Sequence, residues 1–375
     1  MKVSNPNYNT SIANLACSIL KHFHVNEFEN ESLPMADQLL EYDYKNIVVI
    51  LLDGMGKNII ERNLDKNGFF RSHLIGIYNS VFPPTTVAAT TSLYSGLFPN
   101  QHGWLGWDCY YKEINKNVTV FTNKESETGI TVSDQSVAWT YCPYLSVQDR
   151  ILVAGFEAYN VTPFDEPYVS SFEESCKYIK RLCKQDGKKY IYSYWNEPDS
   201  TMHETGCYSE QSKEVLQTLE EQVEHLCCQL SDTLVIVTAD HGHMDSKGVS
   251  ITEYPKLMEC LLRMPSIEPR ALNLFIKPGF HQQFEREFIK EFGTDFILLS
   301  KEEVKEQRLF GTGHDHHRFD EMLGDYLAIA VSNLSIFNSL EDKHKFIGVH
   351  AGLTKDEMLI PLIAIKKRTN VLKSD

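Results

Sequence analysis

Aspartate and histidine residues directly follow apolar segments at separate places in this sequence. Asp53 comes after NIVVILL (46–52), and Asp240 and His241 come after TLVIVTA (233–239). Continuous apolar, β-branched runs are typical of strands buried on both faces of a parallel sheet. Open α/β sheets bind ligands at the carboxyl ends of such strands. Because Zn²⁺ accepts carboxylate and imidazole ligands, these motifs predict a metal site at one edge of a sheet.

Two further motifs offer ligands of the same types. In EPDSTMH, Asp199 and His203 are four residues apart after Pro198, which suits a first helical turn, so both side chains would share one face. His350 lies between glycines in GVHAG, ahead of an apolar segment. Each motif alone also has an ordinary explanation, as a helix cap, a polar loop, a surface pair or a turn histidine. Their recurrence favours metal ligation.

A hydroxyl nucleophile could come from Thr85 or Thr86, in FPPTTVAATTSLYSG (82–96). The two prolines favour an extended approach, and the residues after them predict a helix over 87–94. A threonine at a helix start is ordinarily an N-cap. The same position would let the helix N-terminus stabilise an alkoxide and a bound phosphate. These motifs together predict two-metal phosphoryl transfer, in which a metal lowers the pKa of the hydroxyl.

Other histidines are ambiguous. The GHDHH motif holds His314, His316 and His317, which could line a substrate pocket or bind metal adventitiously in a surface loop. The second interpretation is favoured. His243 and Asp245, in DHGHMD, are expected to support the ligands or to belong to the loop.

Strand-like and helical segments alternate around these motifs. Apolar strand candidates cover 46–52, 190–195, 233–238, 326–331 and 359–365. An amphipathic stripe over 213–230 predicts a helix between two of them. The pattern predicts an α/β fold with a central, mostly parallel sheet sandwiched by helices.

One segment, 251–320, has a different pattern. It contains a strand, a helix with phenylalanines four residues apart (281–292), a short strand and a charged helix. We expect a small α+β cap inserted into the catalytic core. The predicted organisation is therefore a core of residues 1–250 and 321–375 with a cap of residues 251–320.

Composition limits the class of protein. The 375 residues are 42% hydrophobic, which permits a large core, and carry a net charge of -15, which disfavours a nucleic-acid polymer as partner. No apolar run approaches a membrane span. The first twenty residues look like a polar lead-in and a short amphipathic helix rather than a signal peptide. Nine cysteines without CxxC spacing predict reduced thiols in a cytoplasmic protein, the alternative being a secreted protein whose leader has been removed.

Together these residues resemble the alkaline phosphatase superfamily, in its type I phosphodiesterase/nucleotide pyrophosphatase-like branch. The matching motifs occur in the family's order between about residues 46 and 365, whereas 251–320 matches much less. They are ILLDGMG, FPPTTVAATTSLYSGLFPNQHG, EPDSTMHETG, TADHG and GVHAGLTKDEMLIPLI.

The resemblance implies a role for each position. Thr86 would be the nucleophile that forms a phospho-threonine, and the backbone of Thr85 would help to orient the phosphate. Asparagine often stands at position 107 in such enzymes and donates to a phosphoryl oxygen, but this chain has Trp107 there. Asn115 or Asn123 could replace that donor. The implied ligands are Asp199, His203 and His350 for one zinc ion and Asp53, Asp240 and His241 for the other.

The favoured function is thus a two-zinc phosphodiesterase acting on a small phosphorylated substrate, with Thr85, Trp107, His314 and Arg318 as candidate substrate contacts. Manganese is an alternative metal. On the same fold the chain could be a phosphomonoesterase, which needs an additional positive group such as Arg270 or Arg318, a phosphonate hydrolase or a phosphomutase. A non-catalytic metal-binding protein is the alternative from another class.

Overall fold

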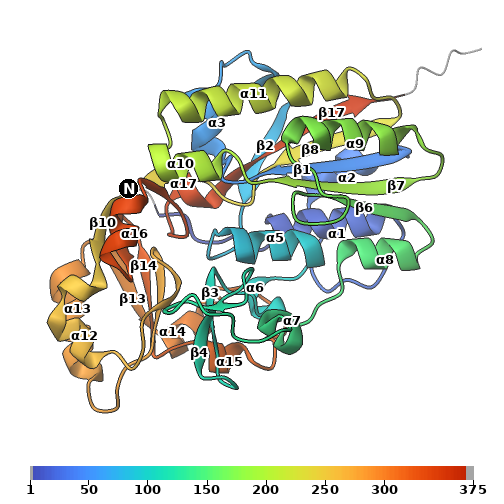
Figure 1. Ribbon diagram of the computed structural model, residues 1–375. Coiled ribbons are helices and arrows are strands. Elements are labelled where there is room, and N and C mark those ends of the chain that lie inside the picture. The colour runs from blue at the N-terminus through green and yellow to red at the C-terminus, as the bar shows by residue number, and fades with distance from the viewer. Residues whose placement is uncertain (1–2, 369–375) are drawn as a thin grey trace, which may run out of the picture.

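The computed structural model describes residues 3–368, and its central feature is a six-stranded sheet (Figure 1). Strands β8, β1, β7 and β6 are parallel, whereas β17 is antiparallel to its neighbours β8 and β2. Across the sheet, in the order β2-β17-β8-β1-β7-β6, the strands span Leu74–Asn79, Leu359–Lys367, Thr233–Thr238, Asn46–Leu52, Lys189–Trp195 and Glu157–Val161. The predicted mostly parallel central sheet is confirmed.

Helices cover both faces of this sheet. Figure 1 shows α3, α9 and α11 on one face and α1, α5 and α8 on the other. In that order they span Lys57–Asn63, Phe172–Lys184, Glu210–Cys227, Ile12–His22, Thr86–Ser95 and Val147–Val153. The stripe predicted in 213–230 belongs to α11, whose Leu216, Leu219 and Val223 are buried. The expected α/β sandwich is therefore confirmed. Within residues 3–368, no helix has both the length and the apolar composition needed to cross a bilayer.

Strand β1 defines the edge at which the candidate ligands emerge. All seven of its residues are buried, because helices cover both faces of the sheet. Leu52 pairs with Trp195 of β7, and Leu51 pairs with Thr238 of β8. The carboxyl ends of three adjacent strands therefore lie level with one another, and the residues that follow them meet at one edge.

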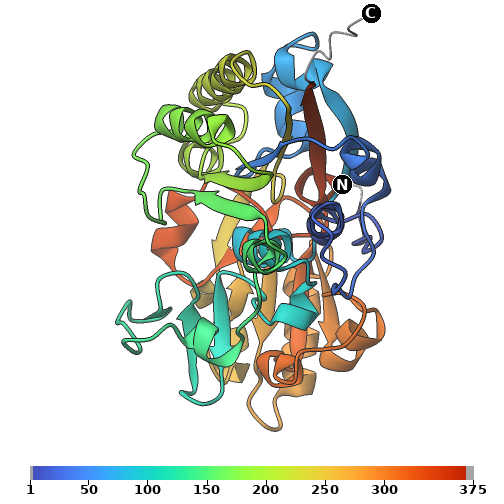
Figure 2. The same cartoon turned by 90° about the vertical axis from the view of Figure 1, so that its right-hand side faces the viewer.

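A second, antiparallel sheet of seven strands forms another layer (Figure 2). In the order β13-β14-β12-β11-β3-β4-β5 its strands span Phe296–Ser300, Tyr326–Ala330, Ala271–Leu274, Ser266–Glu268, Asp108–Tyr111, Lys116–Thr119 and Lys124–Glu125. In both views α5 lies between the two sheets. Residues of the second sheet can therefore reach the N-terminus of α5.

The segment 251–320 contains the expected strand–helix–strand–helix order, as β12, α13 (His281–Phe292), β13 and α14 (Lys301–Glu306). Its sheet extends further, because β3, β4 and β5 come from 108–125. The expectation that 326–331 joins the central sheet is wrong, since β14 pairs with β12 and β13. An apolar run identifies a strand but not its partner. The boundaries of the cap as a separate domain stay a prediction.

Shorter elements complete the described fold. The helices α2, α4, α6, α7, α10, α12, α15, α16 and α17 span Pro34–Leu40, Phe69–Ser72, Pro99–His102, Val137–Tyr141, Asp199–Thr205, Pro255–Cys260, Phe319–Met322, Leu340–Lys345 and Lys355–Met358, and Ile251–Glu253 is a 3₁₀ turn. Strands β10 (Lys247–Ser250) and β15 (Leu334–Phe337) pair with each other, as do β9 (Met244–Asp245) and β16 (Gly348–Val349). The second pairing brings the segment before His350 beside the segment after His241.

Candidate metal centre and active site

Three carboxylates meet where the adjacent strands β7, β1 and β8 end. Asp53 follows β1, Asp240 lies two residues beyond β8, and Asp199 begins α10 after β7. The backbone N–H of Gly54 donates to Asp240 Oδ1 at 3.1 Å, and the N–H of Asp199 donates to the carbonyl of Asp53 at 3.1 Å. Gly54 has φ of +70°, and a Cβ there would lie 3.1 Å from the Asp199 side chain. Glycine at this turn therefore allows the carboxylates to approach one another.

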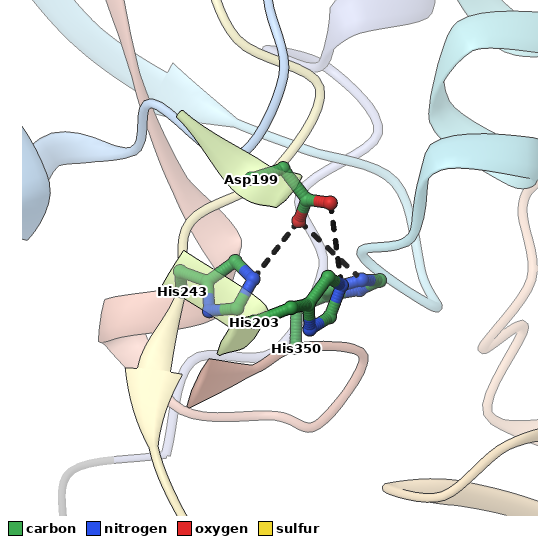
Figure 3. A group of neighbouring side chains, drawn as sticks. All are labelled: Asp199, His203, His243 and His350. Carbon is green, nitrogen blue, oxygen red and sulfur yellow. Dashed lines mark hydrogen bonds and ion pairs between the residues drawn. The ribbon is translucent and has the colours of Figure 1, made fainter. Parts of the chain in front are cut away.

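Histidines surround Asp199 (Figure 3). One carboxylate oxygen of Asp199 lies 3.2 Å from Nε2 of His203, which is one turn further along α10. The other oxygen lies 2.9 Å from Nε2 of His243 and 3.9 Å from Nε2 of His350. These four side chains place one potential ligand atom each within 4.8 Å of one another. The structure thus places His243, which was expected to support the ligands or to belong to the loop, in contact with Asp199 beside the predicted ligands His203 and His350.

Thr86 lies beside a second group of candidate ligands. Its Oγ1 is 3.4 Å from Asp53 Oδ2 and 3.2 Å from His241 Nε2. Nε2 of His241 is also 3.3 Å from Asp53 Oδ1 and 3.5 Å from Asp240 Oδ2. Ligand atoms of Asp53, Asp199 and His241 fall within 4.8 Å of one another, so Asp199 lies between the two groups. The six predicted ligands and Thr86 therefore occupy one continuous cluster.

Hydrogen bonds to backbone carbonyls orient three of the imidazoles. Nδ1 of His203 faces the carbonyl of Gly348 at 2.7 Å, Nδ1 of His350 faces that of Pro84 at 3.1 Å, and Nδ1 of His241 faces that of Gly242 at 3.0 Å. A carbonyl can only accept, so each Nδ1 must carry the proton. With the proton on Nδ1 and the ring neutral, the lone pair of Nε2 would point into the cluster, as it does in metal-bound histidines.

Two buried carboxylate oxygens support the presence of a cation. Asp53 Oδ1 and Asp240 Oδ2 have no hydrogen-bond partner among the described residues. Burial, and then the charge of Asp199, raises the pKa of Asp53, while burial and the charge of Asp53 raise that of Asp240. Buried, mutually repelling carboxylates are costly unless a positive charge lies between them. The donor set therefore fits divalent cations.

The histidines of the cluster differ in the direction in which their surroundings shift the pKa. Burial alone would lower the pKa of His203, but the charge and hydrogen bond of Asp199 raise it to about 9. Burial lowers the pKa of His243 to about 4 and, with the charge of His241, lowers that of His350. His243 and His350 are therefore neutral at pH 7, as a metal ligand must be, whereas His203 would lose a proton when it binds a cation.

Thr85 and Thr86 occupy the N-terminus of α5, as predicted. Thr85 has the extended backbone of an N-cap, but its side chain does not cap the helix. Its hydroxyl donates instead to Glu268 Oε1 of β11, at 2.5 Å. The same carboxylate oxygen accepts the backbone N–H of Trp107 at 3.1 Å. Glu268 therefore connects the residue before Thr86 to Trp107, a link that no motif in the sequence indicates.

Sequence reasoning also missed Tyr194. Its hydroxyl donates to Asp53 Oδ2 at 2.5 Å. Burial and the charge of Asp53 raise the pKa of Tyr194, so the phenol stays protonated and can donate. The only local signal was a tyrosine near the end of a buried strand.

The other candidate substrate contacts lie in different surroundings. Arg318 forms an ion pair with Glu113, lies over the ring of Tyr141 at 4.5 Å, and lines a cavity with Lys112, His317 and Glu321. None of these lining residues belongs to the two ligand groups. His314 is exposed. The structure therefore does not join Arg318 or His314 to the cluster by any direct contact.

Arg270 is held in a buried ion pair. Its Nε and Nη2 donate to the two carboxylate oxygens of Glu357, at 2.6 and 2.9 Å, and both side chains are fully buried. Glu357 also accepts the N–H of Gly352 at 2.7 Å. The pair therefore anchors the loop that carries His350 and leaves Arg270 unavailable to a substrate phosphate.

We expect Arg270→Met or Glu357→Gln to lower the free energy of unfolding by about 3–5 kcal/mol, because either change leaves a buried charge without its partner. Urea denaturation followed by circular dichroism measures the loss. Lys57→Met removes an exposed i,i+4 pair with Glu61 and provides the control, with an expected change below about 1 kcal/mol. Equal effects of the buried and exposed changes would show that the pair does not stabilise the fold.

Comparison with known proteins identifies a family for this chain. The family model of type I phosphodiesterase/nucleotide pyrophosphatase matches residues 47–352. No curated protein matches the chain significantly.

Three similar solved structures have TM-scores of 0.61–0.64. An inactive threonine-to-alanine variant of murine ectonucleotide pyrophosphatase/phosphodiesterase 5, in complex with AMP, is 18% identical, with 85% of this chain and 87% of that chain covered and a TM-score of 0.63. The human protein is 16% identical, with 86% and 91% covered and a TM-score of 0.64. Phosphonoacetate hydrolase from Sinorhizobium meliloti, with phosphonoformate, is 13% identical, with 87% and 90% covered and a TM-score of 0.61.

These likenesses show the alkaline phosphatase-like fold, and the family match covers well over half of the chain. The protein is a hydrolase of phosphoric ester bonds that belongs to the type I phosphodiesterase/nucleotide pyrophosphatase family, within the alkaline phosphatase superfamily.

Proposed function

We propose that this enzyme is a two-zinc phosphodiesterase that acts through a covalent phospho-threonine on Thr86. The position of the Thr86 hydroxyl carries the proposal, since it lies within 3.4 Å of both Asp53 and His241. The family is metal-dependent, and Asp199, His203 and His350 would hold one ion. Asp53, Asp240 and His241 would hold the other. Such ions supply Lewis acidity and lower the pKa of coordinated oxygens.

The N-terminus of α5 would bind the phosphoryl group. The first N–H groups of a helix have no partner within the helix, and the positive end of the helix dipole favours anions. Thr86 is the first residue of α5, so its hydroxyl lies where a bound phosphate would be held. Attack by Thr86 Oγ1 on phosphorus would form the P–O bond and expel the first alcohol, and water would then release the monoester. The inactive threonine-to-alanine variant of the murine relative supports this role for a threonine.

The charges around the cluster favour diesters over monoesters. A phosphomonoester carries an additional negative charge, which a monoesterase neutralises with an arginine, a lysine or a third metal. No arginine or lysine in residues 3–368 forms an ion pair with Asp53, Asp199 or Asp240, and Arg270 is held by Glu357. A phosphonate substrate is the second candidate, because phosphonoacetate hydrolase has the same fold.

Mixed aspartate and histidine ligation is the reason to propose zinc, with manganese as the alternative. Small phosphorylated molecules are the proposed substrates, since the similar structures bind AMP and phosphonoformate. A cytoplasmic location also remains our proposal. It is supported by the nine cysteines, which all lie in the described part of the chain and are free thiols.

Hydrolysis of bis-p-nitrophenyl phosphate and p-nitrophenyl phosphate by the zinc-loaded enzyme tests the assignment. A monoester carries an additional negative charge, and Arg270 is held by Glu357 and so is unavailable to offset it. We therefore expect kcat/KM for the diester to exceed that for the monoester by at least about tenfold, or 1.4 kcal/mol of transition-state binding. Release of phosphate from phosphonoacetate is measured in parallel. A preference for the monoester, or turnover of the phosphonate alone, would contradict the diesterase assignment.

A further inference from the structure

The helix that carries Thr86 begins without the cap that its sequence offers. Thr85 occupies the N-cap position of α5 and has the extended backbone of an N-cap residue, with φ of -140° and ψ of 151°. A threonine at this position ordinarily accepts a hydrogen bond from the N–H of the second or third helical residue, here Val87 or Ala88. In this protein the Thr85 side chain forms no such bond.

The first turn of α5 therefore keeps free donors. The first four N–H groups of a helix have no acceptor within the helix. The N–H of Thr85 donates to the carbonyl of Pro83 at 2.9 Å, but those of Thr86, Val87 and Ala88 find no acceptor within residues 3–368. All three residues are buried, and buried N–H groups without an acceptor are rare. Three neighbouring donors thus remain available to a ligand beside the Thr86 hydroxyl.

Glu268 explains why the hydroxyl of Thr85 leaves these donors free. The hydroxyl donates to Glu268 Oε1 at 2.5 Å. Thr85 is fully buried, so without this acceptor its hydroxyl could not turn to water and would need another partner in the protein. The backbone of Thr85 already has the conformation of an N-cap. Rotation of the side chain would therefore be sufficient to bring the hydroxyl onto the N–H groups of α5.

The acceptor oxygen of Glu268 is fixed from the other side. Oε1 also accepts the backbone N–H of Trp107 at 3.1 Å. Gly106 packs closely against β11, because a Cβ there would lie 2.7 Å from Ile267 Cγ2. Burial raises the pKa of Glu268 to about 7, against the hydrogen bond from Thr85, which lowers it. A carboxylate and a carboxylic acid both offer an oxygen that accepts, so the contact with Thr85 needs an oxygen at this place rather than a charge.

We propose that Glu268 is a positioning residue, which holds the Thr85 hydroxyl away from the N-terminus of α5 and so keeps the first N–H groups of the helix free for the phosphoryl group. The inference rests on the proposed function, in which the phosphoryl group binds at α5. Loss of the acceptor would let the hydroxyl cap the helix. The hydroxyl and the phosphoryl group would then compete for the same donors.

Calorimetric titration of the metal-loaded enzyme with inorganic phosphate tests the inference. Glu268→Ala should weaken phosphate binding by about tenfold, because the Thr85 hydroxyl then occupies a donor that would otherwise bind a charged oxygen. Adding Thr85→Val to Glu268→Ala removes the competing hydroxyl at nearly the same shape, so the affinity should return to within about twofold of that of the unaltered enzyme. Glu268→Gln keeps an acceptor oxygen and should also stay within about twofold.

Glu303→Ala is the matched control. Glu303 accepts the hydroxyl of Ser300 at 2.9 Å and its N–H at 2.8 Å, at the start of α14, and its replacement should leave phosphate binding unchanged. Equal weakening in Glu268→Ala and in the double variant would overturn the inference, because removal of the Thr85 hydroxyl cannot relieve a loss of packing or of direct contact. Unchanged binding in Glu268→Ala would overturn it as well.

Amide hydrogen exchange tests the role of Glu268 independently of phosphate. Exchange at Val87 and Ala88 should be slower in Glu268→Ala than in the double variant, since only the single variant retains a hydroxyl that can cap α5. Equal exchange in the two variants would refute the positioning role. Failure of the proposed function has a different result, in which the unaltered, metal-loaded enzyme neither hydrolyses the diester nor binds phosphate.

Discussion

Replacing Thr86 with alanine should lower kcat for a diester by about three orders of magnitude or more, because it removes the proposed nucleophilic oxygen. Thr86 Oγ1 is the hydroxyl that contacts both Asp53 and His241. Thr86→Ser keeps a hydroxyl there and should retain measurable activity. Steady-state hydrolysis of bis-p-nitrophenyl phosphate measures both variants.

Thr90→Ala is the matched control for this prediction. Thr90 is a buried threonine one turn further along α5, and its hydroxyl donates to the carbonyl of Thr86 at 2.6 Å. Its replacement should change kcat by less than about tenfold, since a helix interior tolerates alanine well. Mass spectrometry of acid-quenched enzyme should show a phosphoryl adduct on the peptide that contains Thr86. Full activity of Thr86→Ala, with metals still bound, would refute the nucleophile assignment.

Removal of divalent cations should abolish turnover and also destabilise the fold. Cations that bind only the folded protein stabilise it by about 4 kcal/mol at a thousand times their dissociation constant. Their removal leaves Asp53 Oδ1 and Asp240 Oδ2 buried without partners. Dialysis against a chelator, followed by thermal unfolding and by addition of Zn²⁺ or Mn²⁺, measures both effects. Turnover that persists in fully metal-free enzyme would contradict the metal-dependent mechanism.

The affinity for metal should rise with pH. In the metal-free state Asp199 raises the pKa of His203 to about 9, despite the opposing effect of burial. A cation must displace this proton, so the apparent affinity should fall by about tenfold per pH unit below 9 from this group alone. Isothermal titration with Zn²⁺ between pH 6 and 9 tests whether the affinity rises with pH. His203→Gln should flatten the dependence, whereas His314→Gln, at an exposed histidine, should not.

Near-isosteric replacement of a ligand gives a further test of the same site. Asp240→Asn should weaken metal binding and turnover together, because an amide lacks the negative charge of the carboxylate. Asp134→Asn changes an exposed aspartate and serves as the control. Unchanged metal content in Asp240→Asn would remove Asp240 from the proposed ligand set.

Short-range patterns in the sequence were sufficient to predict the strands and the turns that carry the proposed ligands. An apolar run followed by aspartate predicts both the strand and its polar end, because burial on two faces requires a continuous apolar run. Asp53 after β1 and Asp240 after β8 follow this rule. The four-residue spacing of Asp199 and His203 likewise indicated one helical face, which α10 provides. Local spacing also placed Thr86 at a helix start.

Only the tertiary structure decided which distant residues join the cluster. Glu268 reaches Thr85 across 183 positions of sequence, and Tyr194 reaches Asp53 across 141. These contacts depend on the packing of the second sheet against α5 and on the register of β7 with β1, and no local pattern encodes either. The pairing of β14 with β12 and β13, and the enclosure of Arg270 by Glu357, have the same origin. Local sequence therefore determined the elements and their polar ends, whereas the packing between elements determined the partners of each side chain.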